Sequence, residues 1–136
     1  MIYITRKETF SAAHKLERKD WTVEKNMEVF GKCSNPNWHG HNYVLLVTVK
    51  GEVNMETGFV INLTHVSEIL KQKVLCKVDH KNLNVDVDFM LGKLSSTENL
   101  AIGIWNEIEK DIKKLGGKLH CVRVQETDKN FVEYYG

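Results

Sequence analysis

The chain has 136 residues, which is enough for one domain with a substantial apolar core, and we expect a single domain over residues 1–136. Its 19 lysines and arginines nearly balance its 18 aspartates and glutamates, giving a formal net charge of +1 with both signs spread along the chain. This balance excludes a polybasic surface of the kind that binds nucleic acid or anionic membranes, so we expect neither partner.

The first half of the chain predicts mainly strands. Residues 2–14 predict a strand that is interrupted at the charged positions 6–8, and residues 17–27 predict a connection with a short helical turn. Residues 41–50 are apolar and β-branched, which is typical of a strand, and a turn bounded by glycines leads to a hairpin partner at 59–62.

The second half predicts two helices. Apolar residues recur with the helical period from 63 to 74, which predicts one amphipathic helix, whereas residues 76–94 lack a period and predict a long loop. The second helix is expected to begin at the capping box formed by Ser95 and Glu98, and to stop at the glycine pair 116–117.

Two further strands, at 119–127 and 131–135, are expected to close the chain around a turn at 128–130. The resulting order is ββααββ. By the rules of layer packing this order predicts an α+β fold, in which two helices cover one face of an antiparallel sheet.

A pair of histidines two residues apart predicts a metal site. His39 and His41 lie at the start of the 41–50 strand, where side chains at i and i+2 project from the same face. Two such rings supply two ligands of a metal site, and a catalytic zinc needs a third ligand and an open position. The alternative is that the two histidines are simply surface residues.

His14 is the best candidate for the third ligand. It ends the segment 10–14, in which Phe10, Ala12 and His14 share one strand face. Cys33 leaves three possibilities open: a metal ligand that gives a Cys-His-His set, a small buried residue, or a free thiol that ionises beside a dication and becomes a base or nucleophile.

Two other groups have both a functional and an ordinary interpretation. Asp79 and His80 are an adjacent acid and imidazole, which near a zinc site can orient a base or move a proton, although such a dipeptide is more often a surface loop. Glu126 ends an apolar strand face, where it either accepts two N–H bonds from an amino-heterocycle or reaches solvent.

The three cysteines, Cys33, Cys76 and Cys121, form no C-x-x-C pair. An odd number of isolated cysteines favours free thiols in a reducing compartment over a disulfide framework. Charges at positions 6–8 also interrupt any apolar core that a signal peptide would need, and no apolar run approaches the roughly 20 residues that span a bilayer. We therefore expect a cytoplasmic protein.

Taken together, these motifs resemble the 6-pyruvoyl-tetrahydropterin synthase family. The resemblance runs from about residue 9 to residue 135, with five segments in the family order: FSAAHKL at 10–16, FGKCSNPNWHGHNY at 30–43, VDHKNL at 78–83, STENLAIGIW at 96–105 and QETDKN at 125–130. The fold that the resemblance implies is the T-fold, with a four-stranded antiparallel sheet and two helices on one face. It also implies a homohexamer, a dimer of trimers with sites at subunit interfaces.

The family implies a zinc-dependent lyase of tetrahydrobiopterin biosynthesis. It would convert 7,8-dihydroneopterin triphosphate to 6-pyruvoyl-tetrahydropterin and triphosphate, with one Zn²⁺ per subunit. By motif, the zinc ligands would be His14, His39 and His41. The proton-transfer set would be Cys33, Asp79 and His80, and the pterin would contact Glu126, with Thr97 and Glu98 close to the ring. Candidates for binding the triphosphate are Lys15, Arg18, Lys32, Lys81 and Lys129.

Two alternatives to this function stay open. One is the related 6-carboxy-tetrahydropterin synthase of the deazapurine (queuosine) pathway, although the five residues between Cys33 and His39 favour the pyruvoyl branch. The other is a non-catalytic T-fold protein that binds zinc or a pterin. Trp38 keeps it open, because the family commonly has glycine there and an indole must be accommodated beside the metal.

Overall fold

The computed structural model describes all 136 residues and contains one five-stranded sheet in the order β3-β1-β2-β4-β5. The strands are β1 (Ile2–His14), β2 (His39–Gly51), β3 (Lys81–Asn82), β4 (Lys118–Gln125) and β5 (Phe131–Tyr134). The helices are α1 (Val23–Phe30), α2 (Leu63–Leu70), α3 (Cys76–Val78) and α4 (Thr97–Lys114). Short turns of other helix types cover Gly31–Ser34, Lys71–Leu75 and Asp88–Met90.

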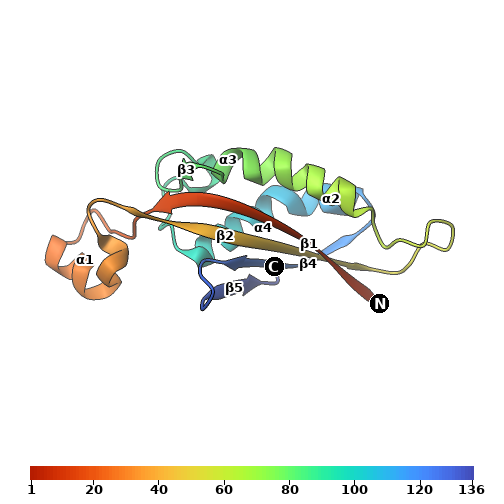
Figure 1. The fold of residues 1–136 in the computed structure, drawn as a ribbon, viewed down its shortest axis with the longest axis horizontal. Helices are drawn as coiled ribbons and strands as arrows, with labels where there is room; N and C mark the ends of the chain where they lie inside the picture. Colours follow the sequence, from red (N-terminus) through yellow and green to blue (C-terminus); the bar gives the residue numbers. More distant parts are fainter.

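The molecule has two layers. In Figure 1, α4 passes behind the strands, α2 runs along the upper edge of the sheet, and the face toward the viewer carries no helix. Side chains from α2 and α4, such as Leu70 and Ile104, are fully buried against sheet residues such as Leu45 and Val47. The α+β class is therefore confirmed: α2 and α4 cover one sheet face, the other face is left open, and α1 lies beyond the end of the sheet.

The predicted four-stranded antiparallel sheet is wrong in two respects. The sheet has five strands and is mixed, because the two-residue strand β3 pairs in parallel with β1 at Ala12 and Ala13. Strand β3 lies within residues 76–94, for which the sequence predicts a long loop. The hydrogen bonds from the His80 amide to Ser11 and from the Leu83 amide to Ala13 cover an edge of β1 that would otherwise have unpaired backbone groups.

The predicted strand at 59–62 is absent. Strand β2 already pairs with β1 on one side and β4 on the other, so no edge is open to a further partner. The segment after β2 instead closes on itself. The amide of Gly58 donates to the carbonyl of Asn54 and the amide of Asn54 donates to Phe59, before Asn62 caps α2 through the Thr64 amide.

Strand β1 is continuous, although an interruption at residues 6–8 was predicted. Arg6 and Glu8 point to the same face, and Nε of Arg6 donates to the Glu8 carboxylate at 2.8 Å. Ser67 on α2 donates to the same carboxylate at 2.7 Å. The charges are therefore paired beneath the helix, and the strand does not break.

The helix boundaries also differ from the prediction. Residues 23–30 form a full eight-residue helix where only a short turn was expected, and α2 continues through the π-turn Lys71–Leu75 into α3. The N-cap of α4 is Ser96, whose side chain accepts from the Asn99 amide, and not Ser95. The hydroxyl of Ser95 is used elsewhere, as described below.

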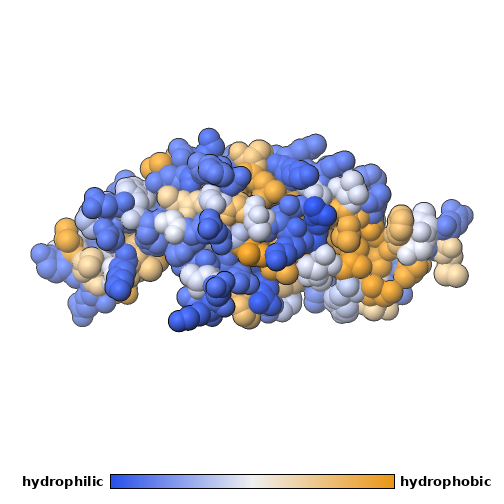
Figure 2. Space-filling view, viewed as in Figure 1, coloured by the Kyte–Doolittle hydropathy of each residue, from blue (hydrophilic) through white to orange (hydrophobic).

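Exposed apolar residues gather at the end of the molecule that carries the start of β1 and the loop after β2 (Figure 2). They include Ile2, Val53 and Phe59, of which Ile2 and Phe59 are 44% and 54% exposed. None of the helices combines the length and apolar content that crossing a bilayer requires.

Candidate metal centre

The register of β1 and β2 brings three histidines together. His14 lies directly opposite His39, and Ala12 lies opposite His41, so the i and i+2 positions of β2 flank the end of β1. Gly40 lies between the two β2 histidines, and a Cβ atom there would be only 3.1 Å from the carbonyl oxygen of Ala12. Glycine at this position therefore allows the strands to approach closely.

The three imidazoles form a compact cluster. One ring nitrogen from each of His14, His39 and His41 lies within 4.8 Å of the others, and the ring centroids are 4.4 to 5.2 Å apart. His14 is only 1% exposed. The predicted trio is thus brought together in space by two paired strands.

The hydrogen bonding of His14 fixes which nitrogen is free. Nδ1 lies 2.7 Å from the carbonyl oxygen of Ser95, and because a carbonyl only accepts, Nδ1 carries the proton. The lone pair is then on Nε2, which is buried and has no hydrogen-bond partner. A histidine that donates from one nitrogen to a carbonyl and leaves the other free has the arrangement found in metal ligands.

The other two histidines also leave buried nitrogens unpaired. Nδ1 of His39 and Nε2 of His41 have no hydrogen-bond partner, and burial is the main cause that lowers the pKa of all three rings. The rings are therefore held neutral, the form that binds a metal. Buried polar atoms without partners are rare, and a cation at the cluster would satisfy them, so these residues fit a metal ion.

A cavity of about 270 Å³ opens beside His14. We call it the Cys33 cavity. It collects residues from five separate parts of the chain: His14, Leu16, Cys33, Ser96, Thr97, Glu98, Glu126, Asn130, Phe131 and Val132. Four predicted site residues, Cys33, Thr97, Glu98 and Glu126, thus line the same hollow as a candidate metal ligand.

The carboxylate of Glu126 lies inside the site. One oxygen accepts a hydrogen bond from the buried hydroxyl of Thr97, and the other lies 3.0 Å from Nε2 of His41 without forming a hydrogen bond to it. The side chain is 20% exposed. Of the two positions that the sequence left open for Glu126, the structure shows the one facing the cavity.

Asp79 and His80 lie at the other side of the histidine cluster. Nδ1 of His80 lies 2.9 Å from the Asp79 carboxylate, and His80 lines a second cavity, of about 570 Å³, together with His41, Lys81 and Asn82; we call it the His80 cavity. The Ser11 amide donates to Asp79, which is the main cause that lowers the pKa of this carboxyl. The His80 side chain is 83% exposed.

The predicted proton-transfer set is therefore divided within one chain. Cys33 borders one cavity and His80 the other, and no residue lines both. The histidine cluster lies between them, since His14 lines the first cavity and His41 the second. A larger cavity of about 750 Å³ lies by Lys50 and Trp105, but contains none of the predicted site residues.

Two site residues have a left-handed backbone. Trp38 has φ of 67° and His80 has φ of 58°, and these are the only residues other than glycine with positive φ. Such backbone conformations cost free energy and tend to cluster at functional sites. Trp38 adopts the conformation that glycine would adopt easily, while its indole lies beneath the ammonium of Lys15, 5.7 Å from the ring centroid.

The sequence prediction missed three groups at the site. The carbonyl of Ser95 orients His14, the side chain of Asn84 contacts Ser95, and the hydroxyl of Tyr43 is buried next to the histidines without a partner. Burial is the main cause that raises the pKa of Tyr43, followed by the charges of Glu126 and Cys33. Tyr43 could be inferred from its place two residues after His41, but no sequence spacing indicates Ser95 or Asn84.

A family model, curated relatives and a solved structure all relate this chain to the same family of proteins. The family model described as 6-pyruvoyl tetrahydropterin synthase matches residues 3–136. Proteins named 6-pyruvoyl tetrahydrobiopterin synthase from Homo sapiens and Drosophila melanogaster are 43% and 42% identical, over 98% of this chain and 90% and 79% of their own lengths. A solved structure of the Caenorhabditis elegans 6-pyruvoyl tetrahydropterin synthase matches with a TM-score of 0.92 at 38% identity, covering 99% of this chain and 95% of that chain.

Proposed function

The chain belongs to the 6-pyruvoyl tetrahydropterin synthase family, and from this premise we propose that it is a lyase of tetrahydrobiopterin biosynthesis. The substrate is 7,8-dihydroneopterin triphosphate and the products are 6-pyruvoyl-tetrahydropterin and triphosphate. The observation that carries the proposal is the cluster of three neutral histidines with unpaired nitrogens, which borders a cavity containing both Cys33 and Glu126.

The metal that fits the cluster best is Zn²⁺, one per chain. Imidazole nitrogens suit zinc, and three protein ligands are typical of catalytic zinc sites. When bound, Zn²⁺ supplies Lewis-acid polarisation to the oxygens of the substrate side chain, which acidifies the neighbouring C–H bonds. His14, His39 and His41 would hold it, and Ser95 would keep the His14 ring in the required orientation.

Glu126 binds the pterin ring. A carboxylate with two oxygens accepts two parallel N–H bonds from an amino-heterocycle, and a charge-assisted pair of this kind also fixes the orientation of the ring. The hydroxyl of Thr97 donates to one of these oxygens and so limits rotation of the carboxylate. Glu98 lines the same cavity and lies within reach of the bound ring.

Cys33 removes a proton from the substrate side chain as a thiolate. Its position supports this role, because Cys33 and Glu126 line the same cavity of about 270 Å³ and a ring anchored at Glu126 would share that space with the thiol. Asp79 and His80 hold and return protons, the aspartate orienting the imidazole through Nδ1 at 2.9 Å. Their exposure at a sheet edge leaves the imidazole free to act on a bound substrate.

The triphosphate is bound by cations that lack a carboxylate partner. Lys15 pairs with Glu17 and Arg18 pairs with Asp20, both at 2.8 Å, so these two are already neutralised. Lys32, Lys81 and Lys129 form no ion pair. Lys81 adjoins His80, and Lys129 lies in the turn after Glu126. Lys32, Lys81 and Lys129 are therefore better candidates for binding the triphosphate than Lys15 and Arg18.

The active assembly is a homohexamer, a dimer of trimers with sites at subunit interfaces. Support comes from the open sheet face, from the exposed Asp79–His80 pair and from the separation of that pair from the Cys33 cavity. An interface would bring one chain's exposed pair toward a neighbouring chain's cavity. The three free cysteines support a cytoplasmic location, because thiols persist in a reducing compartment.

The proposal is tested by the product of the reaction. The zinc-loaded protein is incubated with 7,8-dihydroneopterin triphosphate, and the pterin is identified by mass. We expect 6-pyruvoyl-tetrahydropterin with release of triphosphate. A carboxy-pterin with acetaldehyde would assign the chain to the deazapurine branch, and binding without turnover would make it a non-catalytic relative.

A further inference from the structure

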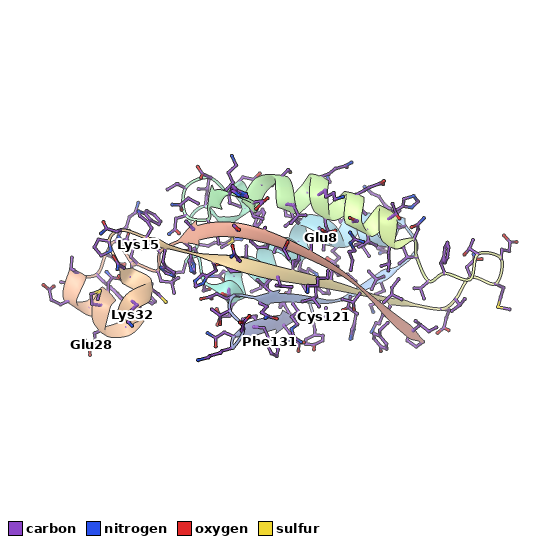
Figure 3. The ribbon with its side chains drawn as sticks, viewed as in Figure 1. Glu8, Lys15, Glu28, Lys32, Cys121 and Phe131 are labelled. Atoms are coloured by element: carbon purple, nitrogen blue, oxygen red, sulfur yellow. The ribbon has the colours of Figure 1, made fainter.

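The side chain of Asn84 pairs with the backbone directly after His14. The Lys15 amide donates to Oδ1 of Asn84 at 3.0 Å, and Nδ2 of Asn84 donates to the Lys15 carbonyl at 2.8 Å. The side-chain amide thus makes the two bonds that a neighbouring strand would make. Lys15, which lies near the end of the sheet that carries α1 (Figure 3), is held in place by this pair.

Asn84 also holds the residue that orients His14. The hydroxyl of Ser95 donates to Oδ1 of Asn84 at 2.8 Å and lies 3.1 Å from the Lys15 carbonyl. Ser95 is 1% exposed, and its own carbonyl accepts the hydrogen bond from Nδ1 of His14. A chain of hydrogen bonds therefore runs from Asn84 through Ser95 to the candidate metal ligand. It also explains why Ser95 does not cap α4.

The same residue closes the edge of the sheet. The segment 80–83 runs beside β1, with backbone bonds from His80 to Ser11 and from Leu83 to Ala13. Asn84 continues this ladder by its side chain, past His14 to Lys15. The segment that carries Asp79 and His80 is thereby fixed in register with the strand that carries His14.

We propose that Asn84 is a positioning residue of the metal centre, which sets the orientation of His14 through Ser95 and joins it to the Asp79–His80 segment. This proposal rests on the proposed function, because it concerns the same three-histidine site. The side chain of Asn84 forms no hydrogen bond to Cys33, to His80 or to the histidine rings. It therefore acts through its hydrogen bonds to Ser95 and Lys15. Removing a residue that orients a metal ligand from outside the coordination sphere commonly weakens metal binding roughly 10–100-fold.

The test is the zinc affinity of purified variants, measured by competition with a chromophoric chelator. We expect Asn84→Ala to bind Zn²⁺ about tenfold more weakly than the unmodified protein. Asn84→Asp keeps the acceptor for Lys15 and Ser95 but sets a charged oxygen against the Lys15 carbonyl in place of the donor, so it should also lose affinity. Ser95→Ala keeps the carbonyl that faces His14 but loses the hydroxyl that faces Asn84, and it should weaken zinc binding as well.

A double variant tests whether the two residues act together. If Asn84 acts through Ser95, Asn84→Ala combined with Ser95→Ala should weaken binding by much less than the product of the two single effects. The matched control is Asn62→Ala, which removes the N-cap bond of α2 to the Thr64 amide and has no contact with the histidines. It should lower the melting temperature while leaving zinc affinity unchanged.

The outcomes separate this proposal from the proposed function. Unchanged zinc affinity in folded Asn84→Ala would overturn the positioning role and leave the lyase proposal standing. If Asn84→Ala does not fold, Ser95→Ala decides in the same way. If the unmodified protein turns over substrate but binds no zinc at the histidines, the metal site is wrong and the positioning role fails with it.

Discussion

The carboxylate of Glu126 lies 3.0 Å from Nε2 of His41, so the residue proposed to read the pterin touches a residue proposed to hold the metal. The two come from different strands, since Glu126 follows β4 directly and His41 lies in β2, its neighbour in the sheet. The proposed pterin site and the proposed metal site are therefore directly adjacent. We expect substitution of Glu126 to change the affinity for the pterin, and substitution of the histidines to change the affinity for the metal.

Glu126→Gln should weaken pterin binding. The amide keeps the shape of the side chain but loses the charge and one acceptor, which costs about 1.5–3 kcal/mol, or roughly 10–100-fold in Kd. Binding of a pterin to the metal-loaded protein is measured by fluorescence. The control is Glu133→Gln on β5, which pairs with Arg123 at 3.6 Å and does not line the cavity. Equal affinity in Glu126→Gln would place the carboxylate outside the binding site.

Cys33→Ala should abolish turnover while leaving the metal bound. Removing a positioned base commonly costs about 10²–10⁴-fold in rate, whereas three histidines remain to hold zinc. The measurements are the turnover rate and the zinc content of the purified variant. Cys76→Ala, at an exposed position on α3, should retain both. Loss of zinc from Cys33→Ala would identify Cys33 as a ligand instead of a base.

The free energy of unfolding of the metal-free protein should fall as the pH drops below about 6.5. Burial lowers the pKa of His14, His39 and His41 from the ordinary value of 6.5 in the folded chain. The unfolded chain therefore takes up protons first, and the loss of stability continues down to the folded pKa values. Above pH 6.5 both states are neutral and this contribution to the pH dependence vanishes.

Urea denaturation at pH 7.5, 6.5 and about 5 measures this dependence. Protons compete with metal for the same nitrogens, so zinc affinity should fall once the pH approaches the lowered pKa values of the folded chain. The control is His65→Asn on the exposed side of α2, which should leave the slope unchanged. Stability that rises on acidification would contradict the buried, neutral state of the three rings.

Substitutions at Trp38 should show the cost of its left-handed backbone. Trp38→Gly and Trp38→Ala lose the same indole contacts, but alanine keeps the steric penalty at φ of 67°. We expect the glycine variant to be more stable by about 1 kcal/mol. At Trp21, where φ is not positive, the order should reverse, because glycine gains more freedom on unfolding. The same order at both positions would exclude backbone strain at Trp38.

The cluster of three histidines was predictable because it depends on the alternation of side chains along each strand. Alternation along β2 places His39 and His41 on one face, and alternation along β1 places His14 on the face of Phe10 and Ala12. The sequence could not show that β1 and β2 pair in the register that sets His14 opposite His39. That register is fixed by thirteen residue pairs along the two strands.

The wrong predictions share one physical cause, which is competition from distant partners. The hydroxyl of Ser95 looks like a helix cap in sequence, but Asn84 and Lys15 bind it in space. The charges at Arg6 and Glu8 look like a strand break, but they pair with each other and with Ser67. Strand β3 has only two residues and no apolar pattern, so it exists only because the edge of β1 is open to it.

The division of the site also lies beyond sequence reasoning. The resemblance groups Cys33 with Asp79 and His80, whereas the fold places Cys33 at one cavity beside the histidines and His80 at another. Sequence motifs state which residues belong to a site but not which chain or face supplies each one. The proposed hexamer would reunite them, and the molecular mass in solution tests that assembly.

The most direct test of the account is the turnover rate measured as zinc is returned to metal-free protein. The substrate is 7,8-dihydroneopterin triphosphate, and triphosphate release is followed together with the mass of the pterin product. The account predicts that 6-pyruvoyl-tetrahydropterin forms at a rate that rises with zinc and saturates at about one zinc per chain. Full turnover by the metal-free protein, or no turnover at any zinc content, would contradict it.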